Sequence, residues 1–147
     1  MLRKKKSGRR KGYTLVELMV VIAIMAILAA VSVGVYTGYV ERAREAEMYE
    51  TARQIKQALS VCEAEYVGPD GADPKLFWTE AFLKPPNHPK SILYPYVGEI
   101  TKDCTEYSLK TARENGSSGY YITGFTYKTE EYEVQWKKDS GITVKKR

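Results

Sequence analysis

A carboxylate at the start of a long apolar run is the most distinctive chemical group in this sequence. Glu17 follows Thr14 by three residues, and no charged residue occurs from Leu18 to Tyr36. A Thr followed three residues later by Glu is typical of a capping box, in which both side chains accept hydrogen bonds from free N–H groups at a helix start. The alternative is a charge that binds a cation, because placing an acid inside a membrane costs about 2.5–3.5 kcal/mol unless it is paired.

The other residues that could do chemistry form no recognisable site. His88 is the only histidine and lies in the proline-rich segment 85–89, without a set of acids around it in sequence. Asp70 and Asp73 flank a predicted turn, but they offer too few oxygen ligands for calcium. No nucleophile with its base, phosphate-binding glycine loop or zinc pattern is present. We therefore expect a protein that is not an enzyme and that needs no cofactor or metal.

The apolar run is long enough to cross a membrane. Its 19 residues, 18–36, would span about 28 Å as a helix. Seven basic residues and no acid precede it within residues 1–12, which by the positive-inside rule predicts a cytoplasmic N-terminus. The apolar part of a removed signal peptide is usually only about 7–15 residues long, so a retained anchor is favoured over a cleaved signal.

The helical pattern continues beyond the membrane. Apolar residues recur at steps of three and four until Gly68 and Pro69, which predicts one helix from about residue 14 to 66. Small residues also recur every fourth position within it, at Ala26, Ala30, Gly34 and Gly38. Such spacing lets a second helix approach closely, so we expect helix–helix packing there.

The remaining residues predict a small head of α+β class. Asp73-Pro74 should start a short helix that ends near Leu83, whereas Tyr94-Pro95-Tyr96 predicts an extended or turning path. Four strands are expected at about 105–111, 119–127, 132–138 and 142–146, separated by turns at 114–119, 128–131 and 139–141. Connections this short require an antiparallel meander, whose apolar face should cover the outer half of the long helix.

Two cysteines, Cys62 and Cys104, are the only ones in the chain. Both fall beyond the predicted membrane segment, where a disulfide can persist. A bridge closing a loop of about 40 residues would stabilise the head by about 3–4 kcal/mol. The alternative is a pair of small, buried thiols, since Cys62 falls on the apolar stripe of the predicted helix.

The N-terminal residues resemble a known signature. Gly12-Tyr13-Thr14-Leu15-Val16-Glu17, with a basic leader before it and an apolar tract after it, closely resembles the N-terminus of type IV prepilins and pseudopilins. The resemblance implies cytoplasmic cleavage after Gly12 by a prepilin peptidase and N-methylation of Tyr13. It also implies that Glu17 engages the N-terminal amine of a neighbouring subunit. The family most often has Phe in place of Tyr13, and many members have Pro in place of Gly34.

This resemblance implies a pilin-like fold with four parts. Residues 1–12 would be a leader removed on processing, and 13–36 the transmembrane and assembly half of the helix. Residues 37–66 would be its amphipathic half, and 67–147 the head. The net charge of +5 then belongs to the leader, because its removal leaves 16 basic and 18 acidic residues. We therefore expect no specific binding of nucleic acid.

The expected function is that of a structural subunit of a type IV pilus-like filament. Gly12 and Tyr13 would serve processing, and Thr14, Glu17, Gly34 and Gly38 assembly. The expected partners are a prepilin peptidase and N-methyltransferase, related pilin subunits, the inner or cytoplasmic membrane and an assembly machinery. The subunit would end in a cell-surface filament. Three alternatives stay open: a pseudopilin of a type II secretion or competence system, acting in a periplasmic pseudopilus; a single-pass anchored protein with an extracellular binding or enzymatic head; and a soluble domain released from a signal peptide.

Overall fold

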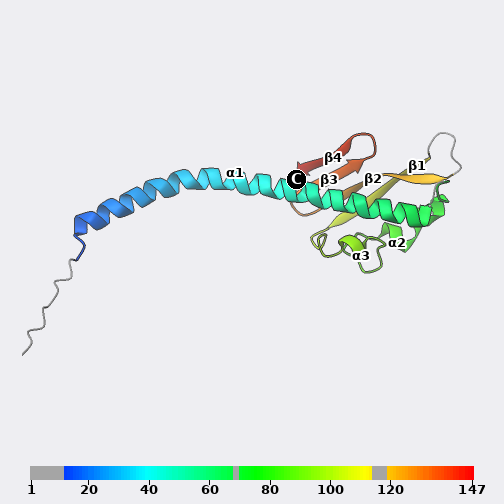
Figure 1. The fold of residues 1–147 in the computed structure, drawn as a ribbon, viewed down its shortest axis with the longest axis horizontal. Coiled ribbons are helices and arrows are strands. Elements are labelled where there is room, and N and C mark those ends of the chain that lie inside the picture. The colour runs from blue at the N-terminus through cyan, green and yellow to red at the C-terminus, as the bar shows by residue number, and fades with distance from the viewer. Residues whose placement is uncertain (1–11, 68–69, 114–118) are drawn as a thin grey trace, which may run out of the picture. The chain divides into compact units, whose positions relative to one another are not determined.

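The computed structural model describes residues 12–67, 70–113 and 119–147 of the chain (Figure 1). The predicted leader, apart from Gly12, and most of the predicted turn at 114–119 therefore lie outside the described residues. The chain divides into two compact units, Met1–Glu41 and Arg42–Arg147, which we describe one at a time. Among the described residues, the first unit contains the N-terminal part of a helix and the second contains the head.

The long helix α1 spans Leu15–Cys62 and is followed by a π-helical turn, Glu63–Val67. The predicted helix over 14–66 is thus confirmed, except that its last turn is wider than an α-helix. All six buried residues of α1 lie in the second unit and follow steps of one and three: Thr51, Ala52, Ile55, Ala58, Leu59 and Cys62. This spacing places them on one face, as an amphipathic helix requires.

The sheet is a four-stranded antiparallel meander in the order β1-β2-β3-β4. Its strands are β1 (Glu106–Arg113), β2 (Tyr120–Lys128), β3 (Tyr132–Lys137) and β4 (Gly141–Lys146). All four predicted strands are confirmed, with bounds that differ by at most two residues. The short connections 129–131 and 138–140 explain the order, because antiparallel neighbours need only a tight turn between them.

One face of the sheet packs against α1, as predicted. Phe125 and Val134 are fully buried in one cluster with Ala52 and Ile55 of α1. Phe125 lies 5.8 Å from Trp136 and 6.2 Å from Tyr107, measured between ring centroids. Burying a side chain of this size contributes about 1.5–3 kcal/mol, so this cluster accounts for much of the stability of the head. The α+β architecture is confirmed.

The segment after α1 differs from the single short helix that we predicted. A 3₁₀ helix, Pro74–Trp78, and a short α-helix, α2 (Glu80–Leu83), are separated by Thr79 in an extended conformation. The predicted helix start is correct: the Lys75 amide donates to Asp73 Oδ1 at 2.8 Å, and Pro74 opens the helix. The break occurs because the Thr79 N–H and hydroxyl both donate to Leu76 O, which closes the first helix.

The prediction of an extended or turning path at 94–96 was wrong. These residues open a one-turn helix, α3 (Tyr94–Val97). Pro95 is compatible with it because a proline in the first turn gives up an N–H that has no helical partner anyway. Nearby, the side-chain amide of Asn87 donates to the carbonyls of Lys102 and Cys104 at 3.2 and 3.1 Å, which fixes the chain before β1.

The predicted disulfide is not confirmed, because Cys62 and Cys104 are both free thiols in this structure. The Cys62 thiol donates to Ile92 O at 3.9 Å and the Cys104 thiol to Glu106 O at 3.4 Å. Burial raises the pKa of the Cys104 thiol to about 11 and also raises that of Cys62. Both are therefore protonated at neutral pH, the form that reacts slowly with oxidants.

Tyr107 offers a direct test of the core. Its hydroxyl oxygen is buried and has no hydrogen-bond partner among the described residues. A buried hydroxyl without a partner costs about 1–3 kcal/mol, so Tyr107→Phe should raise the free energy of unfolding of the head by about 1 kcal/mol. Thermal unfolding of the full chain in detergent, followed by tryptophan fluorescence, measures this change. A lower melting temperature for the variant would show that the hydroxyl is paired in solution.

Glu63 offers a second test, because it joins the end of α1 to the sheet. Its Oε1 accepts a hydrogen bond from the Ile122 N–H of β2 at 3.1 Å. Glu63→Ala leaves this N–H without its partner and should destabilise the head by about 1 kcal/mol. Glu63→Gln keeps an acceptor oxygen and should lose clearly less in the same unfolding measurement. Equal losses for the two variants would mean that this hydrogen bond contributes nothing.

Candidate assembly site

Thr14 and Glu17 form the capping box that the sequence predicts. The backbone N–H and the hydroxyl of Thr14 both donate to Glu17 Oε2 at 2.8 Å. In return, the Glu17 N–H donates to Thr14 Oγ1 at 3.3 Å. The first free N–H groups of α1 thus have partners, and the negative charge lies at the positive end of the helix dipole.

Capping engages only one oxygen of the Glu17 carboxylate. Both hydrogen bonds from Thr14 end on Oε2. No hydrogen bond or ion pair to Oε1 is found within residues 12–67, 70–113 and 119–147, and the side chain is exposed. A carboxylate oxygen can accept further donors, so capping and the binding of a cation are compatible at this residue.

Gly12 and Tyr13 precede the helix in an open segment. Tyr13 is 91% exposed, and a side chain added at Gly12 would meet no atom within 4 Å. The peptide bond between them is therefore accessible on an irregular stretch of chain, which is the form that a protease needs.

The first unit presents an apolar helix whose described residues are exposed from Leu15 to Tyr39. Every residue of this helix from Leu15 to Tyr39 is exposed, and nearly all of its large side chains are apolar. Its serine and threonine hydroxyls bond within the helix: Ser32 donates to Leu28 O at 2.7 Å and Thr37 to Gly34 O at 3.1 Å. Such pairing is what a lipid environment demands. This helix is the one element of the described chain whose length and composition would let it cross a membrane.

Packing within the chain does not explain the glycines of this helix. A side chain added at Gly34 or Gly38 would meet no atom within 4 Å. Glycine costs about 1 kcal/mol relative to alanine inside a helix, so its presence at both positions calls for a reason outside the chain. Close approach by another helix is such a reason.

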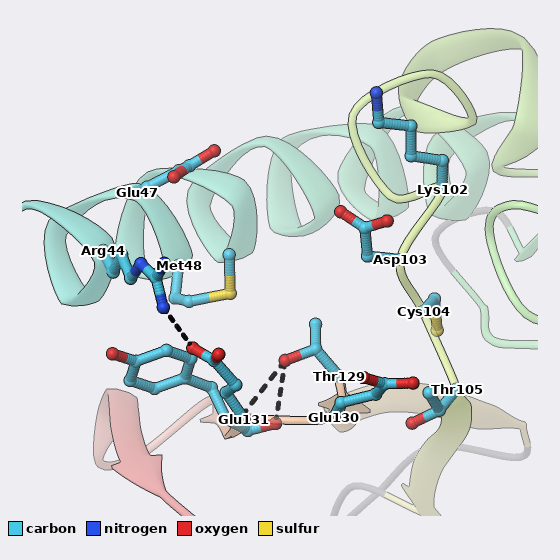
Figure 2. A pocket seen from close by; sticks show the side chains of 11 residues that line it. Arg44, Glu47, Met48, Lys102, Asp103, Cys104, Thr105, Thr129, Glu130 and Glu131 are labelled. Carbon is cyan, nitrogen blue, oxygen red and sulfur yellow. Dashed lines mark hydrogen bonds and ion pairs between the residues drawn. The ribbon is translucent and has the colours of Figure 1, made fainter. Parts of the chain in front are cut away.

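The structure also brings together a groove lined by charged residues that no sequence pattern indicates. It has a volume of about 560 Å³ and lies between α1, the chain before β1 and the β2–β3 turn (Figure 2). Arg44 of α1 pairs with Glu131 of the turn at 2.7 Å across it. Its other charged residues, Glu47, Lys102, Asp103 and Glu130, come from three separate segments. No spacing along the chain signals a site built in this way.

Comparison with known proteins supports the N-terminal signature. Residues 7–33 match the family model of the prokaryotic N-terminal methylation motif. The chain is 35% identical over 74 residues to the type IV major fimbrial protein FimA of Dichelobacter nodosus, covering 50% of this chain and 46% of that protein. It is 38% identical over 65 residues to prepilin peptidase-dependent protein D of Escherichia coli strain K12, covering 44% of each.

The similarity covers only part of each relative. A fimbrial protein of Moraxella nonliquefaciens is 45% identical over 51 residues, covering 35% of this chain and 33% of its own length. The chain thus spans less than half the length of these curated relatives. No solved structure matches it significantly. The chain therefore carries the prokaryotic N-terminal methylation motif and, over about half its length, is similar to type IV fimbrial proteins.

Proposed function

We propose that this chain is a subunit of a type IV pilus-like filament. It is stored in the membrane, cleaved after Gly12, N-methylated at Tyr13 and polymerised through the first half of α1. One observation carries the proposal: the methylation motif over residues 7–33 coincides with an uncovered apolar helix whose sole charge is Glu17. The relatives' names as fimbrial proteins agree with it.

Storage and assembly use the same surface in turn. Before assembly, lipid covers the apolar side chains of residues 15–39, which are exposed in the isolated chain. In a filament outside the membrane, water would meet them unless identical helices covered them. Burial of apolar area contributes about 25 cal/mol per Å², so packing of helix against helix drives the chains together. Gly34 and Gly38 allow the backbones to approach closely.

Cleavage supplies the cation that Glu17 needs. Hydrolysis of the bond after Gly12 creates a free amine at Tyr13, which stays positively charged after a single N-methylation. In the packed core this amine of one subunit pairs with Glu17 of its neighbour. Oε2 remains engaged by Thr14, and Oε1 accepts the incoming donor. The pair sets the register of one helix against the next, because a misplaced neighbour would leave a buried charge unpaired.

Processing is the step that tests this proposal in isolation. The full chain is expressed with and without a prepilin peptidase, and its N-terminal peptide is identified by mass spectrometry. We expect a mature chain that starts at Tyr13, and one methyl group on the amine when the methyl donor is present. Retention of Met1 in the presence of active peptidase, or cleavage beyond residue 36, would rule the proposal out.

A further inference from the structure

The groove of Figure 2 carries unbalanced negative charge. Because Arg44 and Glu131 neutralise each other, the charges left are those of Glu47, Asp103, Glu130 and Lys102. None of these four side chains has a hydrogen bond or ion pair with any residue that the structure describes. The groove therefore offers a net charge of −2, with Asp103 and Glu130 on different walls (Figure 2).

A single metal ion does not suit this arrangement. No group of three or more His, Cys, Asp or Glu side chains within the described ranges is placed to hold one. The carboxylates stand on α1, on the chain before β1 and on the β2–β3 turn instead of converging on one point. Separated carboxylates fit a cationic surface with more than one charged group.

The outer face of the sheet has such a surface at one end. Register places three rows of residues across this face. The first row, Glu106, Lys128, Glu133 and Lys145, alternates in charge and is balanced. The second row, Ser108, Thr126, Gln135 and Thr143, is uncharged. The third row, Lys110, Gly124, Lys137 and Gly141, carries two lysines and no acid.

We name this third row the lysine row. Lys110 and Lys137 are both exposed, and neither ammonium group is paired within the part of the chain that the structure describes. They stand two strands apart, about 10 Å, with only Gly124 between them. Because Gly124 has no side chain, both amines are open to a partner. The lysine row thus offers a charge of +2, equal and opposite to that of the groove.

The groove and the lysine row cannot meet within one copy. The groove lies at the end of the sheet that holds the β2–β3 turn, beside α1. The lysine row lies at the other end of β3, on the face of the sheet directed away from α1. Two complementary surfaces at different places on one subunit make a heterologous contact, which builds an open helical filament when its rotation does not close into a ring.

We propose that the groove of one subunit takes up the lysine row of a neighbouring copy, so that Lys137 and Lys110 meet Glu130 and Asp103 of the next head. The occupant is a second copy of this chain, chosen by charge complementarity and by the repeat that the contact generates. This inference rests on the proposed function, because it adds a contact between heads to the contact between helices. It predicts that assembly weakens as ionic strength rises.

Charge reversal tests the contact in cells that assemble this chain. Lys137→Glu and Glu130→Lys should each lower the yield of sheared filaments about tenfold, because each places like charges opposite one another. The double variant restores one opposite pair and should return to within about threefold of the original yield. Lys75→Glu and Glu99→Lys are matched controls on exposed residues outside both surfaces and should have no effect.

Cross-linking tests the contact without any substitution. Filaments are assembled from a mixture of isotopically light and heavy chains and treated with a carbodiimide, which joins an amine to a carboxylate in contact with it. Mixed light–heavy peptides joining Lys137 or Lys110 to Glu130 or Asp103 are the expected result. Filaments that lack these peptides, or a double variant no better than the single ones, would overturn the inference. The proposed function would stand in that case, since its test is the processing of Gly12.

Discussion

Glu17→Gln should leave cleavage after Gly12 intact and lower filament yield by about a hundredfold or more. Glutamine keeps an oxygen that can accept from the Thr14 N–H and hydroxyl, so the cap of α1 survives. The charge is lost, and the neighbour's amine is left buried without its partner. Removing one member of a buried ion pair costs about 3–5 kcal/mol, and each 1.4 kcal/mol is worth a factor of about ten.

The measurement compares sheared filaments with the pool of mature subunit in the membrane. Glu45→Gln is the matched control, because it removes the same charge from an exposed position of α1 in the second unit. Normal filaments from Glu17→Gln would limit Glu17 to helix capping. Loss of filaments together with loss of cleavage would instead mean that the peptidase needs Glu17 to process the chain.

Phe125→Ala should destabilise the head by about 3–5 kcal/mol, a large part of the 5–15 kcal/mol that holds a typical domain folded. Phe125 is fully buried in the cluster between the sheet and α1, against Trp136 and Tyr107. Ile27→Ala removes apolar atoms from a side chain that is 65% exposed in the first unit. It should leave the unfolding of the head unchanged and reduce filament yield instead.

This contrast separates the two uses of apolar surface in the chain. Thermal unfolding in detergent, read from tryptophan fluorescence, reports on the head alone. A marked loss of head stability in Ile27→Ala would mean that the first unit contributes to folding of the monomer. If Phe125→Ala unfolded at the same temperature as the unsubstituted chain, the cluster around Phe125 would not be the stabilising core of the head.

The features that could be predicted from the sequence depend on residues that lie close together along the chain. The capping box needs only Thr14 and Glu17 at their spacing, and the helix needs only apolar steps of three and four. The antiparallel order of the four strands followed from short connections such as 129–131. The methylation motif is likewise one contiguous segment, residues 7–33.

The features that could not be predicted depend on contacts between distant segments or on one competing local bond. Thr79 divides a predicted helix because its N–H and hydroxyl both turn back to Leu76 O. Pro95 lies in the first turn of α3, where a proline gives up no helical hydrogen bond. The groove joins Arg44 to Glu131, 87 residues later, and the lysine row exists only once the register of three strands is fixed.

The free cysteines are a further feature that could not be predicted from the sequence. Both positions were compatible with a bridge in sequence, and Cys62 does lie on the buried face of α1. The thiols instead donate to carbonyls in different segments, Ile92 and Glu106, which no pattern along the chain could indicate. Whether two cysteines bridge is decided by the placement of their β-carbons, which is a property of the folded head.

The N-terminus of the protein inside isolated filaments tests the central claim most directly. Filaments are sheared from cells that express this chain as their one pilin-like subunit, purified, and analysed by mass spectrometry of the N-terminal peptide. The account predicts that the filament protein is this chain, starting at an N-methylated Tyr13 and lacking residues 1–12. Cells that process the chain but form no filament containing it, or filaments whose subunits retain residues 1–12, would contradict the account.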